Sequence, residues 1–255
     1  MEKEKAMAVK KKTVVIIGGF FVLAIAAVVI AMVVLGTSKP CVMTIDGEKI
    51  SQEELNFYIN RNKALVADYF HKNYDAQVDQ GFWERDFSGE QPKDKLLKDA
   101  TASLRYYKAI LSDCKEKKLI DDISFSYFQK SLKVENERRN NAINNGKVIY
   151  GNSQYTENNY FDYVVSNLQI KQKELMVEQG LLNPDDTDLI QFYRQIRDQY
   201  SEFKSEDGYK DYGDVRNKLI LLYKNQKYDE YIMERVGKQN VVINEEIYRN
   251  ITIAE

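Results

Sequence analysis

The sequence predicts a mainly α-helical protein, in which an N-terminal transmembrane helix precedes a helical domain with short β-strands from its two sequence ends. Three observations support this fold class. Residues 13–36 are apolar and uncharged, and apolar residues recur every three or four positions along most of the remaining chain. The chain also has only 3 proline and 12 glycine residues to interrupt helices. We therefore divide it into a basic tail (1–12), a membrane segment (13–36), a spacer (37–40) and a helical domain (41–255).

The membrane segment determines the predicted location. A helix of its length reaches about 36 Å, and a bilayer core is about 30 Å thick. Lysines 10, 11 and 12 precede the segment, so the positive-inside rule places the N-terminus in the cytoplasm and the helical domain outside the cell membrane. A signal anchor is the interpretation we adopt. Cleavage as a signal peptide near Val34-Leu35-Gly36 stays open, whereas lipid attachment at Cys41 lacks the expected small residues before it.

The helical domain is predicted to begin with a hairpin and a long helix. Asp46-Gly47 lies between apolar residues, which is a turn signal, so residues 41–50 predict a small hairpin. Ser51 and Glu54 have the spacing of a capping box and predict a helix to about residue 72. A second helix is expected to start near Pro92.

The middle of the chain is less regular. Asp121 or Asp122 is expected to cap a third helix, whose apolar stripe stops before residues 135–145. Those polar residues fit either a solvated helix end or the lining of a substrate cradle. Residues 147–151 predict a brief extended segment. A fourth helix is expected between Thr156 and Gly180.

The last third predicts two more helices and a closing strand. Asn183-Pro184 should open the fifth helix, and the sixth should span residues 214–238. The sixth is apolar on nearly all sides over residues 219–223, which predicts a position at the centre of the core. Residues 241–248 predict a strand that pairs with the first one.

Three segments resemble the SurA/PrsA-like extracytoplasmic foldases. Residues 44–55 (TIDGEKISQEEL) are similar to the start of that family, and residues 188–194 (DLIQFYR) to its helix before a tyrosine-rich turn. Residues 212–251 are similar to its C-terminal helix and closing strand. The resemblance implies a SurA-N/trigger-factor-like chaperone domain that binds unfolded polypeptides.

The chain departs from that family at one place. Members usually carry a parvulin-type prolyl isomerase domain before the final helix, and here only residues 205–213 separate the flanking helices. His71 is the one histidine, and we expect it to be a solvated residue at a helix end. The resemblance therefore implies the chaperone scaffold without isomerase activity.

Other chemistries lack their residues in the sequence. It has no nucleophile–base arrangement, P-loop, dinucleotide fingerprint or metal-binding motif, so we expect a non-enzyme without cofactor or metal. A net charge of −2 gives no electrostatic reason to bind nucleic acid.

The expected function is ATP-independent binding of unfolded or translocated polypeptides. The alternative is a scaffold subunit of a cell-envelope or secretion complex, and a prolyl isomerase is the least favoured. Phe82, Trp83 and Phe87 fit either an apolar surface for client chains or a plug between two helices. Cys41 and Cys114 fit either a disulfide or, for Cys114 on an apolar helix stripe, a buried free thiol.

Overall fold

Strands from the two ends of the helical domain meet in one antiparallel sheet with the order β2-β1-β5. A computed structural model describes residues 41–254. Its elements are β1 (Cys41–Ile45), β2 (Glu48–Ser51), α2 (Gln52–Tyr74), η1 (Phe82–Glu84), α3 (Pro92–Glu116), α4 (Phe125–Asn144), α5 (Glu157–Glu178), α6 (Asp186–Ile196), η2 (Arg197–Gln199), η3 (Ser201–Phe203), β3 (Lys204–Ser205), β4 (Gly208–Tyr209), α7 (Tyr212–Lys238), β5 (Val241–Ile243) and α8 (Glu245–Arg249). The mainly helical fold with a few short strands is confirmed.

The predicted membrane segment 13–36 lies outside the described residues. Between residues 41 and 254, the structure has no helix with the length and apolar character needed to span a membrane.

The hairpin β1–β2 forms as predicted. Asp46 and Gly47 both have positive φ angles, 51° and 83°, which a two-residue turn of this hand requires. The apolar side chains of both strands are buried in the main core. On its other edge β1 pairs with β5, Met43 opposite Ile243 and Ile45 opposite Val241, so the chain closes on itself as expected. The closing strand is shorter than predicted, because Asn244 caps a further helix, α8.

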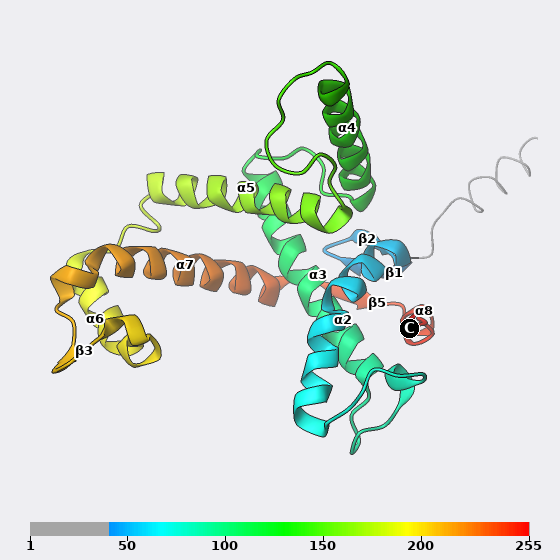
Figure 1. Cartoon of the computed structure of the whole chain (residues 1–255), viewed down its shortest axis with the longest axis horizontal. Helices are drawn as coiled ribbons and strands as arrows, with labels where there is room; N and C mark the ends of the chain where they lie inside the picture. Colours follow the sequence, from blue (N-terminus) through cyan, green and yellow to red (C-terminus); the bar gives the residue numbers. More distant parts are fainter. Residues whose placement is uncertain (1–40, 255) are drawn as a thin grey trace, which may run out of the picture.

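Helices α2 and α3 pack against each other beneath the sheet (Figure 1). Ser51 Oγ accepts a hydrogen bond from Glu54 N at 3.1 Å, as the capping prediction requires. The Glu54 side chain turns instead toward Lys108 on α3, at 2.9 Å. This contact places a charged group of the first helical turn in the interior of the domain.

Helix α4 differs from the prediction at both ends. Its N-cap is Ser124, while Asp122 accepts a hydrogen bond from Ser124 N. The helix continues through residues 135–144, which the sequence left as solvated or irregular. Except for the buried Arg139, its residues are half-buried or exposed, because α4 projects from the body and packs along one side only (Figure 1). Residues 147–151, predicted as a brief extended segment, form no strand.

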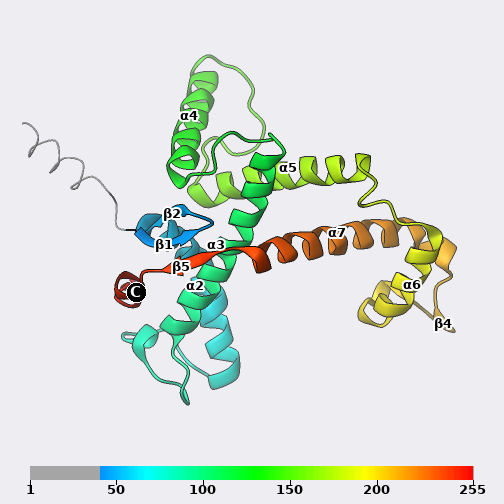
Figure 2. The same ribbon diagram turned by 180° about the vertical axis from the view of Figure 1, so that it is seen from behind.

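Helix α7 is an arm rather than a central helix. Its C-terminal half packs on α3, while its N-terminal half extends away from the body and carries α6, η2, η3 and the β3–β4 hairpin (Figure 2). A second, smaller core forms there around Leu189, Phe203 and Leu219. Leu221 is 54% exposed, so the prediction that residues 219–223 lie at the centre of the main core is wrong. At this end of the arm α6 covers one face of α7 and leaves the others open to water.

Candidate functional site

The predicted aromatic cluster lies in the core. Phe82 is 0% and Trp83 6% exposed, and Phe87 is half-buried. The ring centroids of Phe82 and Trp83 are 4.9 Å apart, and Phe87 packs 5.2 Å from Phe70 of α2. Phe82 and Trp83 are therefore closed to a client chain, and Phe87 is open only in part. The cluster therefore has the second role that the sequence allowed, a plug between α2 and α3.

The cysteines are not joined. Cys41 and Cys114 are both free thiols, so the structure does not have the disulfide. Cys114 is instead the buried thiol on α3 that the sequence also allowed. Burial raises the pKa of Cys114 to about 12, and the neighbouring Asp113 carboxylate adds to this rise. A thiol in that state is a poor nucleophile at neutral pH.

An apolar cavity of about 180 Å³ opens between α2, α4 and α5. Its lining consists of Glu54, Tyr58, Leu111, Ile120, Asp122, Ile123, Ser124, Phe125, Tyr127, Phe128, Ser131, Tyr160, Phe161, Val164 and Val165. An engineered protein cavity of about 150 Å³ admits benzene. The cavity therefore has room for one large side chain of a bound molecule.

The aromatic wall of this cavity is held by ring-to-ring packing. Phe57 of α2 lies behind it, with centroid distances of 5.6 Å to Phe125 and 5.1 Å to Phe161. Phe128 packs 5.8 Å from Phe161 and stacks on Tyr160 at 5.7 Å. Ring pairs at these distances attract one another, so they stabilise the wall.

A shallower groove continues from the cavity along α4. It has a volume of about 330 Å³ and is lined by Tyr127, Lys130, Ser131, Val134, Glu135 and Tyr160. Tyr127, Ser131 and Tyr160 line both spaces, so the cavity and the groove meet there. Tyr127 is 41% and Val134 56% exposed. We refer to the two spaces together as the α4–α5 groove.

Arg139 fixes the far end of α4 to the loop that follows it. The Arg139 guanidinium donates to the carbonyl oxygens of Tyr150, at 3.1 Å, and Asn152, at 2.6 Å. It also bonds Glu135 and the Tyr155 hydroxyl. Tyr155 then stacks on Tyr163 of α5, at 5.6 Å. The polar residues 135–145 are thus partly structural, and Glu135 among them lines the groove.

A buried ion cluster lies beside the cavity. Lys108 has a 3% exposed side chain, and its Nζ lies 2.9 Å from Glu54 Oε1 and 3.1 Å from Glu48 Oε1. Lys108 also donates to the Ile123 carbonyl oxygen at 3.0 Å. Burial raises the pKa of Glu54, while the attraction of Lys108 opposes the rise. This cluster ties α2, α3 and β2 to the segment that leads into α4.

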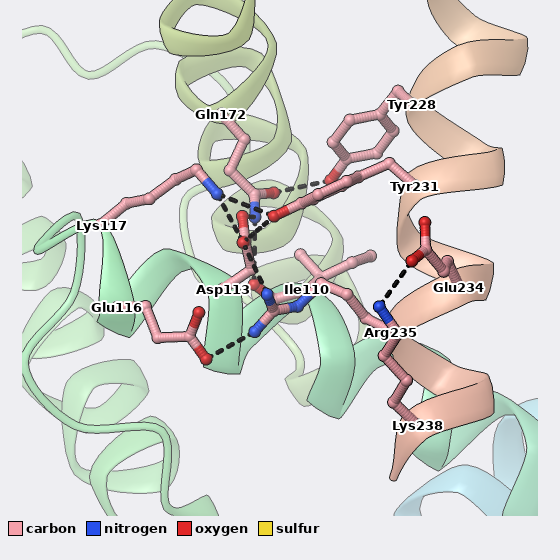
Figure 3. A network of polar contacts seen from close by, with 10 residues as sticks. All are labelled: Ile110, Asp113, Glu116, Lys117, Gln172, Tyr228, Tyr231, Glu234, Arg235 and Lys238. Carbon is pink, nitrogen blue, oxygen red and sulfur yellow. Dashed lines mark hydrogen bonds and ion pairs between the residues drawn. The ribbon is translucent and has the colours of Figure 1, made fainter. Parts of the chain in front are cut away.

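A second polar cluster joins α3, α5 and α7 (Figure 3). Asp113 is fully buried and accepts from Lys117 Nζ and the Tyr231 hydroxyl, both at 2.5 Å, and from Gln172 Nε2 at 2.7 Å. Gln172 in turn accepts from the Tyr228 hydroxyl at 2.6 Å. The Arg235 guanidinium adds a second cation, with its Nη1 3.4 Å from Asp113 Oδ1. The cluster fixes α5 and α7 relative to each other at the base of the arm.

The sequence analysis did not identify the aromatic lining of the cavity or the buried Lys108. Phe125, Phe128 and Phe161 lie on the apolar stripes of α4 and α5, and which of their faces stay open depends on how these two helices cross. Lys108 did carry a signal, since it lies on the same α3 stripe as Leu104 and Leu111. A charged residue inside an apolar stripe indicates a buried partner.

Within residues 41–254, no group of His, Cys, Asp and Glu side chains has an arrangement that fits a metal ion. His71 is exposed near the end of α2, with its Nδ1 3.3 Å from the Ala76 carbonyl oxygen. No family model, curated protein or solved structure matches this chain. The fold and the groove together define the class of protein: a mainly helical protein with an aromatic cavity that opens into a groove.

Proposed function

We propose that this protein binds unfolded or translocated polypeptides without ATP, as a membrane-anchored, extracytoplasmic chaperone. The observation that supports this function best is the α4–α5 groove: an aromatic cavity that holds one large side chain and opens into a groove with exposed apolar residues. Burial of apolar area supplies the binding free energy, so no nucleotide is needed. Weak apolar contacts of this kind tolerate many sequences, which suits a chaperone.

The arrangement of the chain ends is consistent with the proposed relationship to SurA/PrsA-like foldases. A hairpin leads into a long helix, and a C-terminal helix leads into a strand that joins the hairpin. We extend the proposal to a SurA-N/trigger-factor-like fold on this basis. The membrane anchor and the location outside the cell stay proposals from residues 1–36 alone.

The proposal also assigns no enzymatic activity to the chain. Between η3 and α7, where the foldases carry their isomerase domain, this protein has only the short β3–β4 hairpin. The least favoured function, prolyl isomerisation, would need another site. A tetrapeptide isomerisation assay on the purified protein tests this point, and catalysis that follows the protein through purification would contradict it.

A holdase assay tests the proposed function. The full chain in lipid nanodiscs should slow the aggregation of an unfolded test protein without ATP. The double variant Tyr127→Ser, Val134→Ser should lose most of this effect, because both side chains line the groove and are exposed enough to be replaced without unfolding the domain. The matched control is Leu65→Ser, Met233→Ser, since these residues are 69% and 56% exposed on other helices. Equal loss in both double variants would contradict the proposed site.

The alternative function is that of a scaffold in a cell-envelope or secretion complex. Exposed apolar side chains outside the α4–α5 groove, Ile170 on α5 and Leu221 and Met233 on α7, would favour it if they contact a partner. Cross-linking of the membrane-bound protein separates the two functions. Many unfolded client proteins support the chaperone, and one stoichiometric partner supports the scaffold.

A further inference from the structure

The cavity of the α4–α5 groove is lined by acidic residues and no basic ones. Among its described lining residues, Glu54 and Asp122 carry carboxylates, and none is Lys, Arg or His. A neighbouring hollow, which shares Phe125 with the cavity, is lined by Glu53 and Glu157, again without a basic residue. Lys130 enters only in the outer part of the groove, beside Glu135.

The lysines near Glu54 and Asp122 balance the charge of these two carboxylates only in part. Lys108 is shared between two glutamates, Glu48 and Glu54. Asp122 faces both Lys108 and Lys115 at longer range, and a hydrogen bond from Ser124 N holds its pKa below the usual value. Two carboxylates, Glu54 and Asp122, thus line the cavity, and a third, Glu48, shares Lys108 behind it. Against these three stand the two ammonium groups of Lys108 and Lys115. The cavity is therefore electrostatically suited to a positive group.

The same ring cluster already binds a cation, Arg61 of α2. The guanidinium carbon of Arg61 lies 5.5 Å from the Phe57 centroid and 5.0 Å from the Phe161 centroid. The carboxylate of Asp162 lies 2.6 Å from its Nη2. Rings and a carboxylate that surround a cation are a favourable combination, because the negative ring face and the acid both attract it. The cavity also brings rings together with a carboxylate, that of Asp122, while its other carboxylate, Glu54, is paired with Lys108.

We propose that the cavity selects a lysine or arginine side chain of the bound polypeptide. The aliphatic stem would lie against Phe125, Phe128 and Phe161, while the charged head reaches the half-buried Asp122. This inference rests on the proposed polypeptide binding and adds its specificity: apolar segments that contain a basic residue.

Peptide binding measured by fluorescence anisotropy tests the selectivity. The probes are labelled apolar peptides that differ at one central position, which is Lys, Arg, norleucine or Glu. The full chain is held in nanodiscs of uncharged lipid, and binding to empty nanodiscs is subtracted. Because norleucine keeps the stem of lysine and lacks its charge, the Lys and Arg peptides should bind about tenfold tighter than the norleucine peptide. The ratio should shrink at high salt.

A charge-neutral variant locates the effect. Asp122→Asn keeps an oxygen that accepts from Ser124 N but removes the charge, so it should lower the Lys-to-norleucine ratio about threefold. Asp121→Asn is the matched control: Asp121 is exposed, adjacent in sequence and not part of the lining, so its ratio should match that of the unmodified protein.

The outcomes separate the two proposals. Equal affinity for the Lys and norleucine peptides, or an equal change in both Asn variants, overturns the selectivity and leaves polypeptide binding intact. Failure to bind any of the peptides overturns both.

Discussion

Lys108 shows how much one buried charge determines in this fold. Its ammonium group has three oxygen partners at 2.9 to 3.1 Å, from α2, β2 and the segment before α4. A charge at this depth is tolerated because its partners replace water. The same contacts hold Glu54 at the cavity, so the lysine positions a residue of the proposed binding site while it stabilises the core.

Lys108→Met should therefore be strongly destabilising. Methionine has a similar length, but Glu48 and Glu54 would lose their partner, and breaking a buried pair costs about 3–5 kcal/mol. Urea denaturation at neutral pH measures the loss. Lys72→Met is the control, because Lys72 pairs with Asp68 on the exposed face of α2 and should leave the free energy of unfolding nearly unchanged. Similar effects of the two substitutions would show that Lys108 is not buried.

Asp113 should make stability depend on acid pH. Burial alone would raise its pKa, but hydrogen bonds from Lys117, Tyr231 and Gln172 outweigh burial and hold the pKa below its usual value. A carboxylate with a lowered folded-state pKa contributes stability above its unfolded-state pKa of about 3.9 and loses it as the pH falls through the folded-state value.

The variant Asp113→Asn should accordingly have a lower free energy of unfolding than the unmodified protein at pH 7. This difference in unfolding free energy should become smaller below about pH 4. Urea denaturation over a pH series checks this. The control is Asp121→Asn, because Asp121 is an exposed aspartate close to Asp113 in sequence. Its unfolding free energy should differ from that of the unmodified protein by the same small amount at every pH. If the difference in the free energy of unfolding between Asp113→Asn and the unmodified protein is constant from pH 7 to pH 3, Asp113 is not an ionised carboxylate with a lowered pKa.

At the scale of elements, turn and cap residues predicted where elements begin, whereas the apolar pattern did not predict which helix faces are buried. Asp46-Gly47 and Ser51 predicted the hairpin and the start of α2 because turns and caps depend on a few adjacent residues. The role of residues 219–223 was wrong because a run of apolar residues does not tell which faces of a helix receive a neighbour. Here α6 covers the Leu219 face and leaves Leu221 in water.

The small core of the arm gives an element-scale prediction. Leu219 is 0% exposed, so Leu219→Ala should destabilise the α6–α7 unit by about 2–5 kcal/mol through lost burial and a cavity. Hydrogen exchange of α6 amides measures this locally. Leu221→Ala, two residues away on the exposed face, should leave that exchange almost unchanged. Equal effects would mean that α6 does not cover the Leu219 face.

The whole molecule depends on contact between its two ends. Strand β1 receives β5 on one edge, and Ile251 and Ile253 are 1% and 7% exposed in the main core. A chain that ends at Asn240 loses these contacts together. The core around α2 and α3 thus has one wall built from residues that are about 200 positions apart in sequence.

Truncation after Asn240 should therefore weaken the entire main core. Amides of β1 and β2 should lose most of their protection from hydrogen exchange, and unfolding should occur at lower urea. The control is Val242→Ser in the full chain, because Val242 is 59% exposed on β5 and its backbone pairing persists. Unchanged exchange in β1 after truncation would show that the end-to-end sheet is dispensable.

The sequence alone determined the helical class, the hairpin, the starts of α2, α3 and α5 and the pairing of the two ends, because these depend on local turn and cap chemistry and on apolar periodicity. Only the tertiary structure decided which aromatic residues are open. Phe82 and Trp83 have the composition of a binding patch but are buried by α2 and α3, whereas Phe125, Phe128 and Tyr160 look like an ordinary core stripe yet line a cavity. The physical reason is that exposure depends on how distant helices cross, which no local pattern of residues records.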